Sequence, residues 1–298
     1  MTTAPDVHLG MERHTRVCAE QEWGVCPDSP DWHSVPVWGD GYGVRDRDVR
    51  YRPETACGGW RGHVNLSRMK QPTGQWTMPL YPEEAGFVLE MALSRQSGQP
   101  SSYCIDLYTP DDPRRHTGCV VSRARLECSA GAGPPLWNMW IAGGEEQPNG
   151  GLSDNDFDYS ELSPVPFRFQ GAEVQIDGAA ATGVEACAVT IQNNLRTGPA
   201  RAGRPAYLIA GNRTVSLDLK KVADEAALSS AVREGRSVSF SVTLAHPAGH
   251  LLTLDLPVLH AGDCRTSGVP GEPSVNLGRL QAGVDQNGAD VEFDIQVV

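Results

Sequence analysis

The sequence of 298 residues lacks several features that would point to common functions. It has no run of about 20 apolar residues, which excludes a membrane-spanning helix. Basic residues are few: 25 Lys and Arg stand against 37 Asp and Glu, a formal net charge of −12. Because duplex binding needs Lys and Arg to displace phosphate counterions, this charge argues against a nucleic-acid-binding surface. The polar start, Met1–Asp6, contains no apolar signal segment, so we expect folding in a cytosol.

Catalytic motifs are also missing. The chain has no G-x-S-x-G elbow, no phosphate-binding loop, no G-x-G-x-x-G that opens a helix and no H-E-x-x-H. Asp154–Asp158 resembles the start of a calcium loop, but Tyr159 replaces the turn glycine and Val165 the bidentate glutamate. With 37 acidic residues, any proposed pair of glycosidase carboxylates would be arbitrary. We therefore expect no catalytic residue, no metal site and no cofactor, in a protein that is not an enzyme.

The eight cysteines form no C-x-x-C pair, so zinc-ribbon and thioredoxin-like folds lack their minimal signature. Eight cysteines are too sparse for a disulfide-built scaffold, and a reducing cytosol disfavours bridges. We interpret them as small buried hydrophobic residues. Cys18 and Cys26, close in sequence, are the first pair to test for a bridge.

Glycine and proline are abundant: 32 Gly and 22 Pro make up about 18% of the chain, where about 12% is usual. This excess indicates many turns and many short strands. In the second half, a helix is predicted at Glu225–Glu234, capped by Asp224 and stopped by Gly235. Four stretches around it alternate between apolar and polar residues as half-buried strands do: 213–220, 237–244, 252–256 and 291–297.

The first half repeats this order more loosely. A strand is predicted through Val64, Leu66 and Arg68, followed by a helix that begins at Pro82 and stops at Gly98. Two further strands are predicted at 104–108 and 120–128. The recurrence indicates duplication of one β-rich unit, although α+β domains commonly place a helix beside a hairpin and could match by accident.

These patterns predict a mainly β protein, a β-sandwich or β-barrel, built from two similar domains in tandem with one short helix each. Residues 1–142 form the first domain and 165–298 the second. The Gly-, Asp- and Pro-rich stretch 143–164 has almost no apolar periodicity, and we interpret it as a linker.

All seven tryptophans lie in the first half. Trp137 and Trp140 belong to an apolar run, so at least one of them should be in the core. Trp32, Trp38 and Tyr42 lie in a loop, 28–53, that is longer than a compact domain usually tolerates. We expect this loop to be an arm that contacts another subunit. A carbohydrate-binding β-sandwich that uses these tryptophans is the alternative from a different functional class.

Several segments of the second half form a pattern found in one structural family. They are Phe169–Gly178, Val189–Leu195 and Ala210–Leu219, then the helix, the hairpin and Leu254–Leu259. The first half matches more weakly, through Glu20–Gly24, Gly59–Gly62 and the helix after Pro82. The chain resembles the tail tube proteins of long-tailed, siphovirus-like bacteriophages, in a two-domain form. The matching motifs are structural, so the resemblance transfers no active-site residue.

The resemblance implies a virion structural protein, made in the cytoplasm of the host bacterium and located in the phage tail. Three copies of a two-domain chain would form a ring with pseudo-sixfold symmetry, and stacked rings would form a hollow tube. Its partners would be itself and other tail proteins (tape measure, terminator and baseplate), with DNA passing through the lumen unbound and no membrane involved. Another tail component, such as a terminator or baseplate ring, is the closest alternative.

Acidity would have a purpose in such a tube, because an anionic wall repels phosphates. The candidates for that wall lie on the polar faces of predicted strands: Asp218, Asp290, Glu292 and Asp294.

Overall fold

The computed structural model describes residues 14–37, 44–48, 70–93, 95–96, 99–108, 113–131, 133–198, 200–201, 204–205, 207–222, 234–267, 275–283 and 291–296. Several predicted features lie outside these residues: Trp38, Tyr42, Asp290, the strand through Val64, Leu66 and Arg68, and all but the last residue of the helix at Glu225–Glu234.

The described residues are mainly β, as predicted from the sequence, with one α-helix. The elements up to residue 156 are β1 (His14–Ala19), β2 (His33–Ser34), β3 (Val44–Asp48), β4 (Lys70–Pro79), α1 (Pro82–Leu93), β5 (Arg95–Gln96), β6 (Gln99–Pro100), β7 (Tyr103–Tyr108), β8 (Arg114–Ser129), β9 (Leu136–Ala142), β10 (Glu145–Pro148) and the 3-10 helix η1 (Asp154–Asp156). The later elements are β11 (Arg168–Ile176), β12 (Ala179–Ala180), β13 (Val184–Gln192), β14 (Arg196–Thr197), β15 (Ala200–Arg201), β16 (Arg204–Pro205), β17 (Leu208–Ile209), β18 (Thr214–Val222), β19 (Val238–Ala245), β20 (Leu251–Ser267), β21 (Val275–Ala282) and β22 (Glu292–Gln296).

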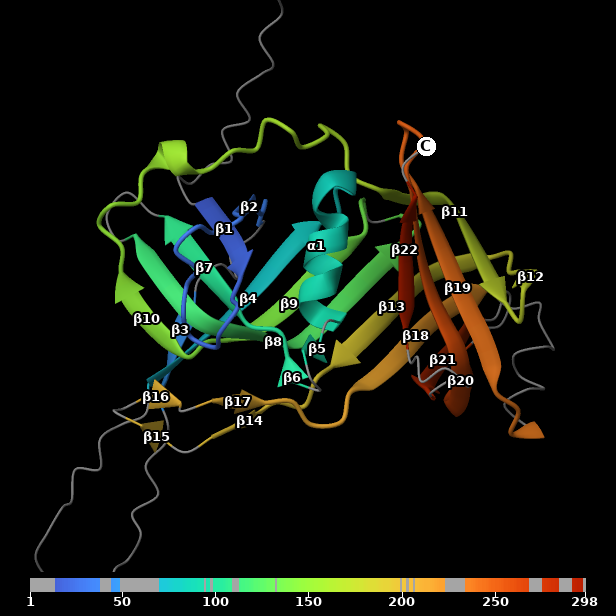
Figure 1. The fold of residues 1–298 in the computed structure, drawn as a ribbon. Coiled ribbons are helices and arrows are strands. Elements are labelled where there is room, and N and C mark those ends of the chain that lie inside the picture. Colours follow the sequence, from blue (N-terminus) through green and yellow to red (C-terminus); the bar gives the residue numbers. More distant parts are fainter. Residues whose placement is uncertain are drawn as a thin grey trace, which may run out of the picture.

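Eight antiparallel strands form what we call the long sheet, in the order β3-β4-β9-β8-β13-β18-β21-β20. Strands β8, β9, β13 and β18 run side by side through its centre (Figure 1). The pairing of β13 with β8 joins the two halves of the chain, so one hydrogen-bonded system of 16 strands runs through both. The division of the chain into two separate domains therefore stays a prediction.

The long strands β8 and β20 each take part in two layers. The first part of β8, residues 114–119, pairs with β7 and β10, and its second part, 120–129, pairs with β9 and β13. The first part of β20, residues 251–259, pairs with β19 and β22, and its second part, 259–267, pairs with β21. The strands that pair with the first parts, together with β1 and β11 beside them, cover one face of the long sheet; we call them the cover strands.

The two halves also share their irregularities. The register of β7 with β8 shifts between Tyr103 and Ile105, and that of β19 with β20 shifts between Val238 and Phe240. The register of β8 with β9 shifts after Val121, as that of β20 with β21 shifts after Ala261. Such bulges bend a strand locally, and here they mark the points where β8 and β20 pass from one layer to the other.

A single apolar core fills the space between the long sheet and the cover strands. In β18, Val215, Leu217 and Leu219 are buried, as the alternating pattern predicts. Trp76 and Trp137 are completely buried, which confirms the prediction that Trp137 or Trp140 belongs to the core.

Helix α1 begins at Pro82 as predicted and packs against the core through its buried face (Figure 1). It ends at Leu93, before the predicted stop at Gly98. Side chains from the second half satisfy its last carbonyls: Asn193 Nδ2 donates to Ala92 O at 3.0 Å, and Arg213 donates to Leu93 O. These bonds replace the missing intrahelical partners of the helix end. Among the described residues, no helix is long and apolar enough to cross a membrane.

Candidate assembly surface

The face of the long sheet that points away from the core is polar; we call it the open face. Its side chains alternate with the core residues along each strand, and neighbouring strands place them in register. Uncharged polar groups on it are Gln75, Thr77, Asn138, Thr190 and Ser216, and charged groups are Arg123, Arg125, Glu127, Asp218 and Lys220.

The charges on the open face compensate one another. Arg125 Nε lies 2.6 Å from Glu127 Oε1, and Arg125 Nη1 lies 3.5 Å from Asp218 Oδ2. The guanidinium of Arg123 lies over the ring of Trp140, 4.6 Å from its centroid. Asp218 is thus paired with a cation, and this part of the face is not the uniformly acidic wall that the net charge suggested.

The predicted acidic residues are not brought together. Asp218 lies on the open face of the long sheet, while Glu292 and Asp294 lie on β22, a cover strand. Asp294 is exposed, and its neighbour Phe293 stands opposite the buried Leu254. Because the cover strands and the long sheet share one core, their outward faces point in opposite directions.

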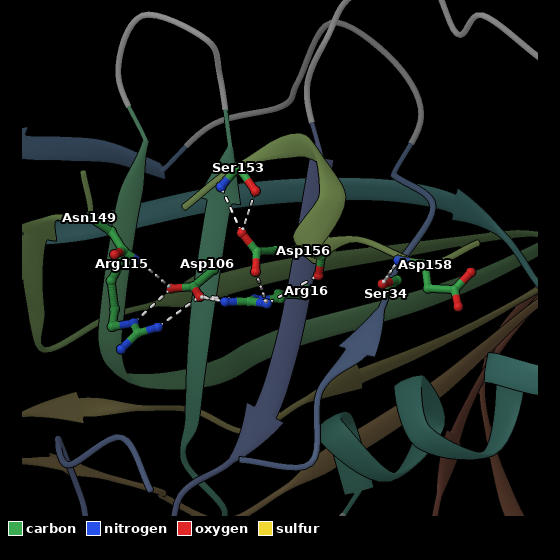
Figure 2. A network of polar contacts seen from close by, with 8 residues as sticks. All are labelled: Arg16, Ser34, Asp106, Arg115, Asn149, Ser153, Asp156 and Asp158. Carbon is green, nitrogen blue, oxygen red and sulfur yellow. Dashed lines mark hydrogen bonds and ion pairs between the residues drawn. The ribbon is translucent and has the colours of Figure 1, made fainter. Parts of the chain in front are cut away.

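An ion network around a buried aspartate joins β1, β7 and β8 (Figure 2). Asp106 on β7 is fully buried between Arg16 on β1 and Arg115 on β8. Its Oδ2 accepts from Arg16 Nε at 3.0 Å and from Arg115 Nη2 at 2.9 Å, and its Oδ1 accepts from Arg115 Nε at 2.7 Å. Asn149 Nδ2 adds a fourth bond at 3.3 Å. The Asp106 carboxylate raises the pKa of Arg115, so the pair stays charged.

Trp32 packs against the two arginines of this network. The guanidinium of Arg16 lies 4.4 Å from its ring centroid and that of Arg115 lies 5.5 Å away. The part of the predicted arm that contains Trp32 is therefore held by its own chain. Nearby, His33 stacks on Phe87 of α1 with centroids 4.0 Å apart.

The segment predicted as a linker, 143–164, is bound to the first half. Strand β10 pairs with the first part of β8. Arg16 Nη1 donates to the carbonyl of Asp156 at 3.1 Å, and the N–H of Asp158 donates to Ser34 Oγ at 3.0 Å (Figure 2). The domain boundaries themselves stay a prediction.

The Glu20–Gly24 motif closes the end of β1. Glu20 is buried and accepts backbone N–H groups of Gly24 and Gly118, each at 2.8 Å, while burial raises its pKa. The ring of Trp23 lies directly over Gly118 and Gly144, where an added Cβ would come within 3.0 and 2.9 Å of it. Gly118 also has a φ of +64°, which favours glycine.

Three cysteines gather although the sequence separates them. The sulfur atoms of Cys18, Cys26 and Cys104 lie within 4.8 Å of one another, and all three are free thiols. Cys104 lies opposite Cys18 in the pairing of β7 with β1, and its hydrogen bond lowers the pKa of Cys18. In the described part of the chain, this is the one group of His, Cys, Asp and Glu side chains close enough together to hold a metal ion, as three sulfur ligands. Cys18 and Cys26, the first pair to test for a bridge, do not form one.

The family model for the phage tail tube protein matches residues 69–295, which include the whole long sheet except β3. The chain belongs to the phage tail tube protein family. A search of curated proteins found no match. The resemblance inferred from the sequence is thereby confirmed, and the protein is a structural protein of the phage tail.

In this tail tube protein, the contacts described above join strands and loops of one chain to each other. Sequence reasoning missed Arg16, Asp106 and Arg115, since their only sequence signal is a charged residue in a strand, and the partner positions lie up to 99 residues apart. It also missed the joining of the halves, because alternation shows which residues are buried but not which strand lies alongside.

Proposed function

We propose that three copies of this chain form a ring with pseudo-sixfold symmetry, and that stacked rings form a hollow tube through which DNA leaves the capsid. The observation that carries this proposal is the repetition within the long sheet. The first half contributes β3-β4-β9-β8 and the second half β13-β18-β21-β20, with the same pairings in the same order. Two equivalent units in one chain are what a sixfold ring of three chains needs.

The open face is the surface that suits a lumen, since the core and the cover strands occupy the other face. Uncharged polar groups and ion pairs, such as Arg125 with Glu127 and Lys220 with Glu185, compensate most of the cations that phosphates could bind. DNA would slide along such a wall without adhering. In this arrangement Asp218 lines the lumen, whereas β22, the strand that carries Glu292 and Asp294, lies on the outside of the ring.

Stacking of rings is a head-to-tail contact that propagates without closing. We assign it to the arm, 28–53, where Trp38 and Tyr42 would contact the next ring and Trp32 would hold the base of the arm. The ends of the tube would meet the tape measure, terminator and baseplate proteins.

Negative-stain electron microscopy of the purified protein and of phage particles tests this function. Rings with a central hole, and tubes at high concentration, are expected. A protein that stays monomeric in solution and in particles would contradict the proposal.

The number of copies per particle, measured by quantitative mass spectrometry, separates a tube from a terminator. A tube requires many rings, and a terminator requires one.

A further inference from the structure

Two of the three gathered thiols, those of Cys18 and Cys104, are buried on the side of β1 and β7 that faces away from the apolar core. Their neighbours Val17 and Ile105 belong to the core, and successive side chains of a strand point to opposite faces. The two thiols therefore share the outer face of these strands with the ion network around Asp106. Packing in the core does not account for their burial.

The third thiol, Cys26, is brought to this pair by a turn with fixed hydrogen bonds. The buried carboxylate of Glu20 accepts the N–H of Gly24 at 2.8 Å, and the N–H of Val25 donates to the carbonyl of Glu22 at 3.1 Å. These bonds turn the chain back after β1 and leave all three sulfur atoms within 4.8 Å of one another. The backbone structure thus assembles the cluster.

We propose that Cys18, Cys26 and Cys104 bind one zinc ion through three thiolates. Sulfur ligands favour soft ions such as zinc over Mg²⁺ and Ca²⁺, which prefer oxygen. Zn–S bonds of about 2.3 Å at tetrahedral angles place sulfur atoms about 3.8 Å apart. Because the three atoms already lie within 4.8 Å of one another, each distance has to shorten by no more than about 1 Å.

The surroundings of the cluster suit such an ion. Three thiolates and one Zn²⁺ leave one negative charge in excess, and the Arg115 guanidinium is the cation that compensates it. Burial raises the pKa of the Cys26 thiol, and the positive charge of Arg115 opposes this shift. Cys26 is only partly buried, so an ion reaches the cluster from its side and a water molecule completes the fourth coordination position.

The site differs from the sequence-based expectation of no metal site. That expectation depended on the spacing of cysteines along the chain, whereas Cys104 joins the other two through the pairing of β7 with β1. The bound ion would fasten the turn after β1 to β7, close to the segment that holds Trp32. All three ligands come from one chain, so the site goes beyond the proposed tube and does not depend on it.

Titration of the purified, reduced protein with Co²⁺ tests the site, because tetrahedral cobalt thiolates absorb visible light and zinc displaces the cobalt. We expect one cobalt ion per chain and loss of the absorbance when zinc is added. Cys26→Ala is the main variant, since Cys26 lies in a partly exposed turn and circular dichroism should show an intact fold. Loss of a group that only supports a ligand costs about 10–100-fold in metal affinity, so loss of a ligand should weaken cobalt binding at least about hundredfold.

Cys119→Ala is the matched control, because Cys119 is a buried thiol of the core and lies outside the cluster. It should bind cobalt as the unmodified protein does. The double variant C57S/C264S checks that these two cysteines are not the ligands, and it should also keep the absorbance.

Thermal unfolding gives a second measurement. Zinc at about a hundred times its Kd should raise the Tm of the unmodified protein by at least about 5 °C and leave that of Cys26→Ala unchanged. A protein that shows no tetrahedral cobalt absorbance would overturn the proposal. So would an undiminished absorbance in Cys26→Ala, or its loss in either control.

Discussion

The two halves of the molecule share their strand pairing but differ in the residues placed at equivalent positions. Asp106 lies between Arg16 and Arg115, and the equivalent Ser241 lies between Gln175 and Asp255. The first half therefore has a buried ion network at these three positions, where the second half has two neutral residues and one acidic residue. The comparison teaches that the pairing of the strands carries the fold, while individual sites are free to diverge.

The halves differ also in what covers their edges. The outer edge of the second part of β8 is covered by β13, and the equivalent edge of β20 has no partner among the described strands. The same edge is therefore an internal contact in the first half and, among the described strands, an uncovered edge in the second.

The largest effect is expected at the ion network. Asp106→Ala removes the buried carboxylate and leaves two partly buried arginines without their partner, which should lower the free energy of unfolding by about 3–5 kcal/mol. The matched control Ser241→Ala should cost less than about 1 kcal/mol, because Ser241 is half-buried and carries no charge. Urea denaturation of both variants measures the difference. Equal losses would contradict a special role for the network.

Proline substitution should distinguish the covered edge from the open one. Thr190→Pro removes a donor from β13 in the middle of the long sheet and should cost at least about 3 kcal/mol. The equivalent Arg45→Pro changes β3, an edge strand, so the protein should stay folded and lose much less stability than with Thr190→Pro. Circular dichroism and urea denaturation measure the loss in both variants. The same loss from both prolines would contradict the distinction between a covered strand and an edge strand.

A buried histidine gives the first half a pH dependence at a position where the second half has a leucine. His116 is buried at the position equivalent to Leu256, and burial lowers its pKa to about 4. As the pH falls below about 6.5 the unfolded chain takes up a proton on this residue first, so stability is lost between about pH 6.5 and pH 4.

His116→Leu should remove this loss. The drop in unfolding free energy between pH 7.5 and pH 5 should be smaller by about 2 kcal/mol in the variant. Denaturant unfolding at the two pH values measures it. The same drop in both proteins would show that His116 is protonated as readily in the folded state as in the unfolded state.

The smallest effect is expected on the open face. Asp218 occupies the position equivalent to Gln75, so Asp218→Gln gives the second half the residue of the first. The ion pair with Arg125 is partly exposed, and its loss should change stability by less than about 1 kcal/mol. Rings should form as before in electron micrographs. Failure to assemble would show that Asp218 contributes to subunit contacts.

Much of the fold could be predicted from local pattern. Alternation located β18 and β19 to within two residues at each end, and Pro82 located the start of α1. The layers could not be predicted, because alternation assigns a residue to a face of its strand but not to a layer of the molecule. Asp218 and Asp294 both alternate with apolar residues in the sequence, yet their strands lie on opposite sides of the core.

Contacts between segments that are distant in the sequence could not be predicted either. Cys18 and Cys104 face each other only because β1 pairs with β7, and β10 is a strand only because the edge of β8 is open to it. The polar composition of 143–164 gives no sign of that pairing, which is made by backbone groups and by an ion pair between Arg114 and Glu146, two residues distant in the sequence.

The central claim is that one chain supplies two equivalent units of a six-unit ring, and single-particle cryo-electron microscopy of the assembled rings tests it most directly. We predict three copies per ring, with strict threefold symmetry and six similar units around the hole. Six copies per ring, or a ring in which the two halves of the chain do not occupy similar positions around the hole, would contradict the account.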